Sequence, residues 1–304
     1  MRETERAMKE IHKFLQEQET ENMSMDEINA LLQAHLKEIN ANIPKELSEE
    51  TAKTADDLIE LAEQKYEEGD EKGALRLARK AQKMDPDNLD IDLFLIACEE
   101  GDIGTIQKKF QRILEKGKTI LEKQGCFQED VGQFWQVLET RPYIRAKGQY
   151  VLLLARAGKL KKAAQEAEDI IRLNEQDNLG IRYVLMHLYA ALEDAESAQK
   201  LLGKYSKYEE GPILLALTLL YYKLDETDQA KKYLRQLTKV NKETRAFVRD
   251  VLTEKVDRVL SVIEKQGGFA PLSEEELVEI YNENIMIYLS APDFFDWLAN
   301  ELKL

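Results

Sequence analysis

The sequence predicts an all-α protein built from tandem pairs of antiparallel helices. Residues with high helix propensity (Leu, Ala, Glu, Lys and Gln) dominate the 304-residue chain. Only 14 glycines and 6 prolines interrupt it, which is sparse for the many turns of a β-sandwich or an α/β enzyme. Apolar residues also recur at helical spacing within segments that repeat along the chain.

Four segments follow one pattern. In residues 55–88, large and small apolar residues open a first helix, Gly69 makes the turn, alanines line a second helix, and Pro86 stops it. The same pattern returns in residues 144–177, 178–211 and 212–242. It is the pattern of the tetratricopeptide repeat, in which small residues let the paired helices approach closely.

The repeats divide the chain into three parts. We expect an acidic, helical N-terminal arm (1–50), with helices near 3–18 and 25–39, and a repeat array (51–242) with an insertion near 122–133. A C-terminal helical cap (243–304) is expected to cover the end of the array, with a helix over 272–289 that opens on a Ser273/Glu276 capping box, and a last helix near 293–302. The predicted fold is therefore an all-α, tetratricopeptide-like superhelix of antiparallel helix pairs.

Composition excludes several classes of protein. The longest apolar run, residues 213–222, is about half as long as a membrane span, and residues 1–21 hold no apolar stretch of the kind that a secretory signal needs. The two cysteines and three histidines show no metal-ligand spacing. The formal net charge of −15 opposes general nucleic-acid binding. We expect a cytoplasmic protein without cofactor or metal, and neither membrane nor nucleic acid as a partner.

Catalytic patterns fail on inspection. Gly117-Lys118-Thr119 is similar to the end of a phosphate-binding loop, but Arg112 occupies the position of the required earlier glycine and no strand precedes it. Residues 85–88 are similar to a calcium loop without its obligatory glycine. The sequence therefore predicts that the protein is not an enzyme.

Two clusters go beyond the general repeat pattern. One is Gly132-Gln-Phe-Trp135 with residues 139–146 (Glu-Thr-Arg-Pro-Tyr-Ile-Arg-Ala), and the other is Leu173-Asn174 with residues 177–183 (Asp-Asn-Leu-Gly-Ile-Arg-Tyr). With the repeats around them, they resemble bacterial tetratricopeptide proteins related to the suppression-of-tumorigenicity-seven family. The resemblance runs from about residue 51 to the end, and departs from the family at Glu175 and Lys147. It implies an all-helical interaction protein and no settled activity.

A basic stretch marks the candidate site. Residues 141–162 hold seven basic residues and no acidic one, in a chain of net charge −15. In a tetratricopeptide superhelix, the first helix of each repeat lines a concave groove, and the repeat register turns Arg145, Arg156 and Arg182 toward it. Guanidinium groups suit carboxylates, so we expect an acidic or carboxylate-bearing peptide segment as the ligand. The predicted partner-binding residues are Arg141, Arg145, Arg156, Asn178, Arg182 and Tyr183.

Structural explanations for the same residues stay open. The arginines could pair with Glu139, Asp169 or Asp177 in an internal network, Asn178 could cap a helix, and Tyr183 could pack between helices. The predicted function is a non-enzymatic protein-interaction scaffold. The alternative is a peptide-sensing regulator with a DNA-binding head, which the six basic and twelve acidic residues of the first fifty disfavour.

Overall fold

The computed structural model describes residues 8, 11, 14–15, 23–42, 47–99, 101–205 and 210–304. These residues form helices and no strand, so the all-α class is confirmed. The chain divides into two compact units: unit 1 is Met1–Gln128 with Phe134–Ala146, and unit 2 is Glu129–Gln133 with Lys147–Leu304. The three-part division expected from the sequence stays a prediction, and the helix expected near 3–18 lies mostly outside the described residues.

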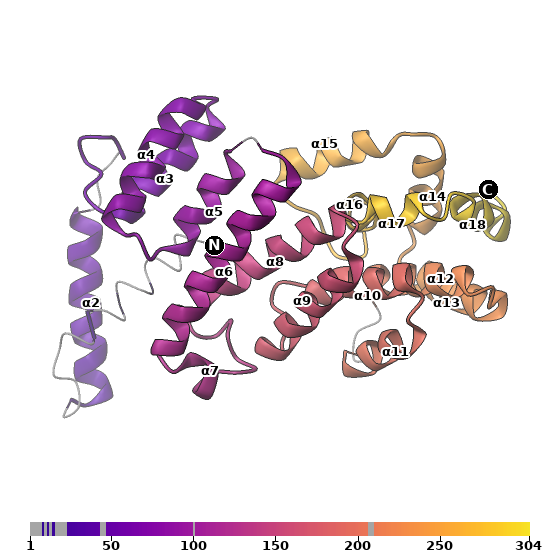
Figure 1. Ribbon diagram of the computed structural model, residues 1–304, viewed down its shortest axis with the longest axis horizontal. Coiled ribbons are helices and arrows are strands. Elements are labelled where there is room, and N and C mark those ends of the chain that lie inside the picture. The colour runs from indigo at the N-terminus through magenta and orange to yellow at the C-terminus, as the bar shows by residue number, and fades with distance from the viewer. Residues whose placement is uncertain are drawn as a thin grey trace. The chain divides into compact units, whose positions relative to one another are not determined.

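Unit 1 contains a series of helices, in which α3 and α4 lie side by side (Figure 1). Their bounds are α2 Met25–Asn42, α3 Ala55–Glu67, α4 Glu71–Met84, α5 Leu89–Ala97, α6 Ile103–Lys123 and α7 Cys126–Glu129, followed by the first residues of α8 Arg141–Arg156. The helices α3 and α4 pack against each other as the first predicted repeat, and α5 contacts both α4 and α6. Side-chain oxygens of Thr54, Asp70, Asn88 and Asp102 cap the starts of α3 to α6, which is why these helices begin where they do.

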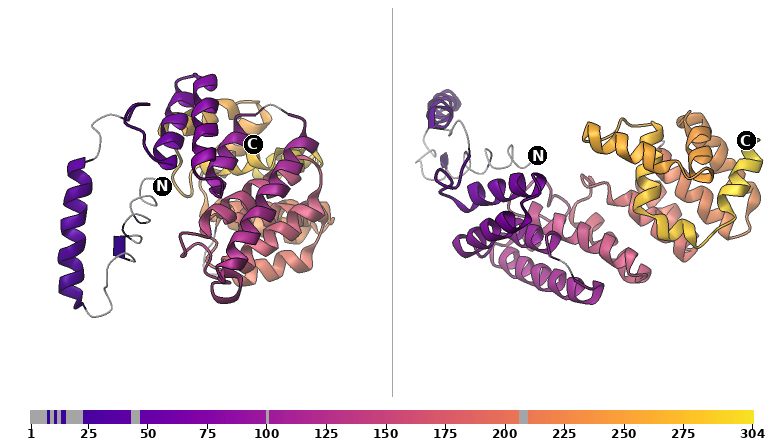
Figure 2. Two further views of the ribbon diagram at one scale, coloured as in Figure 1. Left: turned by 60° about the vertical axis from the view of Figure 1, so that its left-hand side comes forward. Right: turned by 90° about the horizontal axis from the view of Figure 1, so that it is seen from above.

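Unit 2 continues the series of helix pairs, and Figure 2 shows them from two further directions. After the rest of α8 come α9 Leu160–Leu173, α10 Ile181–Leu192, α11 Ala195–Lys204, α12 Gly211–Lys223, α13 Thr227–Val240, α14 Thr244–Leu252, α15 Val256–Gln266, α16 Glu274–Glu283, α17 Ile285–Leu289 and α18 Phe294–Leu302. The three predicted repeats of this region coincide with the pairs α8/α9, α10/α11 and α12/α13.

The helix pairs share one type of turn. A residue with positive φ follows the first helix of each predicted repeat: Gly69 (86°), Gly158 (69°), Glu193 (59°) and Asp225 (58°). The next backbone N–H donates across the turn to a carbonyl five residues earlier, at 2.8 to 3.0 Å in every case. A fifth turn of this kind, at Glu254 (56°), joins α14 to α15, where the repeat pattern is not visible in the sequence. The hairpin geometry therefore continues past residue 242.

Small residues lie at the contacts between helices. Fully buried alanines occupy these positions in both units: Ala62, Ala74, Ala78, Ala81, Ala163, Ala167, Ala190, Ala198, Ala216 and Ala230. The apolar run of residues 213–222 belongs to α12, which is buried from Gly211 to Tyr221 and contacts α10, α13 and α16. Among the described residues, no helix combines the length and apolarity that a membrane crossing requires.

The expected helix over residues 272–289 is wrong in its extent, because Asn284 splits it into α16 and α17. Ser273 caps α16 as predicted, accepting a hydrogen bond from the Glu276 N–H at 3.2 Å. The reciprocal bond of the capping box goes elsewhere, since the Glu276 carboxylate accepts from the Leu272 N–H at 3.2 Å. The last helix, α18, lies where the sequence predicted it.

Candidate binding surfaces

Arg182 is held inside unit 2 by two carboxylates. From α10, its guanidinium donates to Asp177 at 2.8 Å and to Glu210 at 2.7 and 3.0 Å. The Tyr183 ring lies against it, with 4.2 Å from the guanidinium carbon to the ring centroid, and the Tyr183 hydroxyl donates to Glu210 at 2.9 Å. The Arg182 side chain is 15% exposed. Arg182 and Tyr183, both predicted as partner-binding residues, thus lie together with Glu210, which the sequence did not single out.

Asp177 explains both the position of this arginine and the start of α10. Its side chain has no exposed surface, and its two oxygens accept from the backbone N–H groups of Ile181 (2.8 Å) and Arg182 (3.0 Å). Burial raises the pKa of the Asp177 carboxyl, against the opposing effect of its hydrogen bonds. Asn178 is exposed and does not cap the helix, because Asp177 occupies the capping role at that turn.

Arg145 is paired within unit 1. Its guanidinium makes a bidentate contact with Asp90 at the start of α5, at 3.0 Å from Nε and 2.7 Å from Nη2. Both side chains are about 85% buried, being 16% and 15% exposed. The sequence suggested Glu139, Asp169 or Asp177 as partners of the arginines, and the structure adds Asp90, which lies 55 positions away from Arg145. A bidentate pair of this kind fixes α8 against α5.

The other two predicted arginines have different surroundings. In unit 1, Arg141 donates from Nε to the Trp135 carbonyl at 2.6 Å, and its guanidinium lies 5.5 Å from the Trp135 ring centroid. In unit 2, Arg156 is exposed at the end of α8, and its positive charge interacts electrostatically with Glu283. Burial and the neighbouring Glu279 raise the pKa of Glu283, and the charge of Arg156 opposes that shift.

Lys147 is a buried cation whose ion pairs were not predicted from the sequence. The resemblance marked it only as a departure, yet its side chain, 5% exposed, contacts the carboxylates of Glu166 and Asp169 on α9. Burial raises the pKa of Asp169, but the Lys147 charge and hydrogen bonds from Arg172 and Lys147 outweigh it and hold that pKa below its usual value. Part of the basic stretch at residues 141–162 is therefore neutralised inside the helix pair α8/α9.

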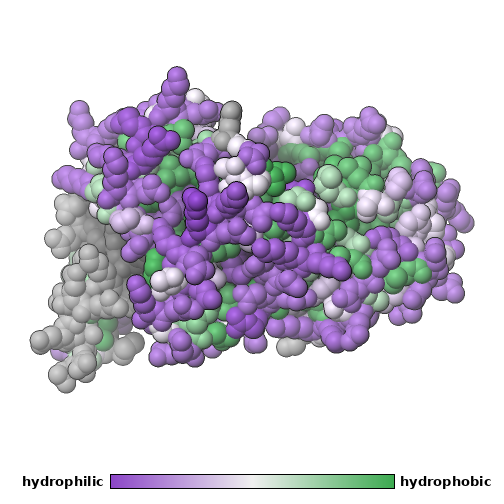
Figure 3. Space-filling model, in the orientation of Figure 1, coloured by the Kyte–Doolittle hydropathy of each residue, from purple (hydrophilic) through white to green (hydrophobic). Residues whose placement is uncertain are grey.

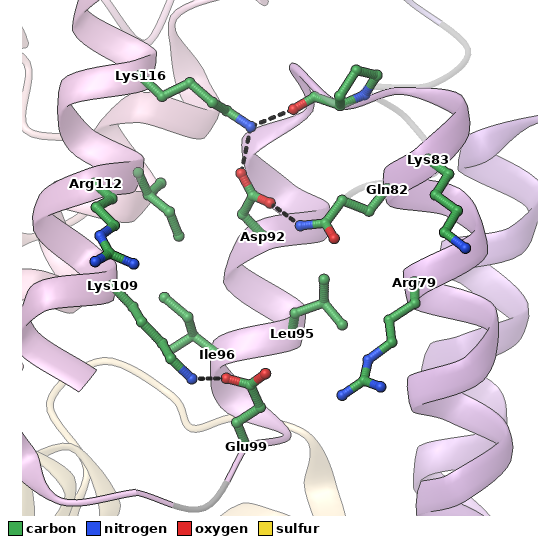
Figure 4. Close-up of a pocket in the computed structure, with 12 residues that line it drawn as sticks. Arg79, Gln82, Lys83, Asp92, Leu95, Ile96, Glu99, Lys109, Arg112 and Lys116 are labelled. Atoms are coloured by element: carbon green, nitrogen blue, oxygen red, sulfur yellow. Dashed lines mark hydrogen bonds and ion pairs between the residues drawn. The ribbon is translucent and has the colours of Figure 1, made fainter. Parts of the chain in front are cut away.

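Unit 1 contains a hollow with a different character. It has a volume of about 790 Å³ and lies over α5, between α4 and α6 (Figure 4). We call it the α4–α6 hollow. Residues that line it are Arg79, Gln82, Lys83, Pro86, Asp92, Leu95, Ile96, Glu99, Lys109, Arg112, Ile113 and Lys116. Its size is within the range of ligand-binding pockets in proteins.

Cations outnumber carboxylates in this lining. Asp92 accepts from Lys116 at 2.5 Å and from Gln82 at 2.7 Å, and Glu99 is paired with Lys109. Each carboxylate of the hollow is thus already matched by a lysine. Arg79, Lys83 and Arg112 are exposed, and within the described part of the chain no acidic side chain forms an ion pair with any of them.

The spacing of these cations places them on facing helices. Arg79 and Lys83 are four residues apart on α4, while Lys109, Arg112 and Lys116 follow at intervals of three and four on α6, so each set shares one helix face. Figure 4 shows Arg79 and Arg112 on opposite helices, with Leu95 and Ile96 of α5 between them. The helical spacing is visible in the sequence, but the facing arrangement arises only from the packing of α4, α5 and α6.

An apolar face in unit 2 contrasts with the hollow. Ile285, Met286 and Leu289 of α17 are 37%, 57% and 62% exposed. Figure 3 shows apolar surface over the C-terminal helices, in a molecule whose visible face is otherwise mostly hydrophilic. The two units therefore expose surfaces of different chemistry.

The motifs rejected as catalytic have structural roles. Gly117 lies inside α6, where a Cβ atom would approach Leu89 and Tyr143 within 2.7 and 2.9 Å, so it permits close packing. The segment 85–88 joins α4 to α5, and the Asn88 side chain caps α5. Among the described residues, no group of three or more His, Cys, Asp and Glu side chains is arranged to hold a metal ion.

Comparison with known proteins gives a likeness in structure only. No family model matches the chain, and no curated protein matches its sequence. The crystal structure of a tetratricopeptide repeat protein from Parabacteroides merdae ATCC 43184 is similar to it, with a TM-score of 0.44 and 16% sequence identity. That likeness covers 82% of this chain and 99% of the other. The resemblance to the suppression-of-tumorigenicity-seven family stays a prediction.

Proposed function

We propose that this protein is a non-enzymatic interaction scaffold that binds a carboxylate-bearing segment of a partner protein. The observation that carries the proposal is the α4–α6 hollow, where five cations face two carboxylates in a chain of net charge −15. Stacked helix pairs commonly serve as binding surfaces, because each pair exposes one face while burying the other. Guanidinium groups bind carboxylates through paired, charge-assisted hydrogen bonds.

The hollow replaces the predicted arginines as the proposed contact. Arg145 and Arg182 already contact internal carboxylates, so a ligand would have to displace a paired, largely buried acidic side chain. Arg156 and Asn178 are exposed members of the predicted set and are secondary candidates. The concave groove that the repeat pattern predicts is not needed for the proposal, since all lining residues of the hollow belong to unit 1.

Partner capture from cell lysate tests this function. The double variant Arg79→Gln/Arg112→Gln removes two cations of the hollow. The matched control Lys80→Gln/Lys108→Gln removes two exposed cations from the same helices, outside the lining. We expect the wild type and the control to retain the same partner, identified by mass spectrometry, and the double variant to lose it. Equal capture by all three forms would reject the hollow as the contact surface.

A further inference from the structure

We infer that the α4–α6 hollow recognises a peptide segment in which acidic residues flank one apolar side chain. This inference rests on the proposed function and specifies its ligand. The apolar part of the lining is Leu95 and Ile96 of α5 with Ile113 of α6, and the cations stand on both sides of it. Leu95, Ile96 and Ile113 are 8%, 9% and 7% exposed, so the apolar part of the lining is small, but an anionic group cannot pair with it.

The pairing inside the hollow determines which cations are available to a ligand. Lys116 forms an ion pair with Asp92 and Lys109 forms one with Glu99, so the charges of these four side chains cancel within the hollow. Arg79 and Lys83 on one side and Arg112 on the other are exposed and carry the surplus charge. A ligand with carboxylates on both sides of an apolar residue matches this arrangement, because its carboxylates would reach the cations on either side while its apolar residue contacts the apolar lining between them.

A peptide fits these observations better than a nucleic acid does. A nucleic acid presents a continuous row of phosphates, and its binding relies on a basic surface that extends beyond one site. Here the net charge of −15 surrounds a local excess of cations, and Asp92 and Glu99 lie within the lining itself. Salt screens the distant charges within about 8–10 Å, so a short acidic segment in the hollow experiences mainly the nearby arginines.

Fluorescence polarisation with the full chain and short, capped, labelled peptides tests the inference. The probe carries glutamates on both sides of a central leucine. In one control peptide asparagine replaces the leucine, and in another glutamines replace the glutamates. We expect saturable binding of the probe and a loss of at least about tenfold in affinity for each control peptide, because both the charge-assisted hydrogen bonds and the buried leucine contribute.

The protein variants assign the binding to the hollow. Arg79→Gln/Arg112→Gln should weaken binding of the probe by about a hundredfold, at about tenfold for each arginine. Lys80→Gln/Lys108→Gln should bind like the wild type. Circular dichroism checks that both variants keep the helical content of the wild type, and the single variants Arg79→Gln and Arg112→Gln replace the double variant if it does not.

Several results would overturn the inference, and they can be separated from failure of the proposed function. Equal affinity for the leucine and asparagine peptides would reject the apolar requirement. A labelled single-stranded oligonucleotide that binds more tightly than the probe, and loses affinity with the two arginines, would identify the hollow as a nucleic-acid site. Absence of probe binding, with lysate capture still dependent on Arg79 and Arg112, would reject the ligand class but keep the scaffold. If capture were also independent of them, both proposals would be wrong.

Discussion

Replacing Arg182 with methionine tests whether its guanidinium is an internal structural group. Arg182→Met keeps a long apolar side chain but removes the charge that Asp177 and Glu210 contact. Glu210 is partly exposed and keeps the hydrogen bond from the Tyr183 hydroxyl. Asp177 has no exposed side-chain surface and would retain only its two backbone donors at the start of α10, so it determines most of the cost.

In Arg182→Met, Asp177 can take up a proton, and the free energy of that protonation limits the loss of stability. Its ordinary pKa is 3.8, so neutralising the carboxyl costs about 4 kcal/mol at pH 7 and about 2 kcal/mol at pH 5, at about 1.4 kcal/mol per pH unit. Removing one partner of a buried ion pair typically costs about 3–5 kcal/mol. The uptake of a proton limits that cost, so we expect Arg182→Met to lose about 2–4 kcal/mol of unfolding free energy at pH 7 and about half as much at pH 5.

Urea unfolding followed by far-ultraviolet circular dichroism at both pH values measures this loss. Arg172→Met is the matched control, because Arg172 pairs with Asp169 in an exposed contact that should contribute at most about 1 kcal/mol. Adding Asp177→Asn to Arg182→Met should restore the part of the loss that comes from the buried charge, since asparagine tolerates the φ of 50° and carries no charge, but one of the two backbone hydrogen bonds is lost because its NH2 group cannot accept. A loss below about 0.5 kcal/mol, or one equal at pH 5 and pH 7, would refute the reasoning.

Three further predictions concern other buried groups. Burial lowers the pKa of His187 from 6.5 to about 4. The contribution of this neutral histidine to the unfolding free energy should therefore be complete above pH 6.5 and fall by about 3 kcal/mol as the pH drops to 4. Urea unfolding of His187→Gln across this range should lack that part of the pH dependence. Gly117→Ala should lower the midpoint of thermal unfolding despite alanine's higher helix propensity, because the added Cβ would meet Tyr143. The control Gly203→Ala has no neighbouring atom within 4 Å of the added Cβ, so it should stabilise the protein by up to about 1 kcal/mol. Lys147→Met should cost about 1–2 kcal/mol in urea unfolding, less than Arg182→Met, because the carboxylates it leaves behind are partly exposed; a larger loss than that of Arg182→Met would contradict this ranking.

The helix pairs could be predicted from the sequence because their signals are local. Small residues at fixed spacing and a turn residue between two apolar-periodic segments depend on neighbours within one repeat. The helix break at Asn284 was missed because the apolar spacing continues across it, and the turn at Glu254 was missed because glutamate is not a usual turn residue.

The candidate site was harder to predict because it depends on contacts between distant segments. Charge counting along the chain selected the stretch around Arg145, but Asp90, a carboxylate that pairs with this arginine, is 55 residues away. The α4–α6 hollow was not predicted from the sequence at all. Its cations come from two helices that each carry an excess of basic residues, with five basic and one acidic residue in α4 and six basic and two acidic in α6. The sequence therefore held a charge signal here that the search for one continuous basic stretch did not select. Only the placement of α4 and α6 on either side of α5 brings the cations together.

The enclosure of Lys147 has a practical consequence for chemical labelling. Amines react with acetylating reagents only when they are accessible and can lose their proton, and this amine is 5% exposed between two carboxylates. Lys83, at the rim of the α4–α6 hollow, is exposed. In a time course with acetic anhydride, Lys83 should be modified early, whereas modification of Lys147 should wait until α8 and α9 separate. Its acetylation rate would therefore report how often this helix pair opens in the folded protein.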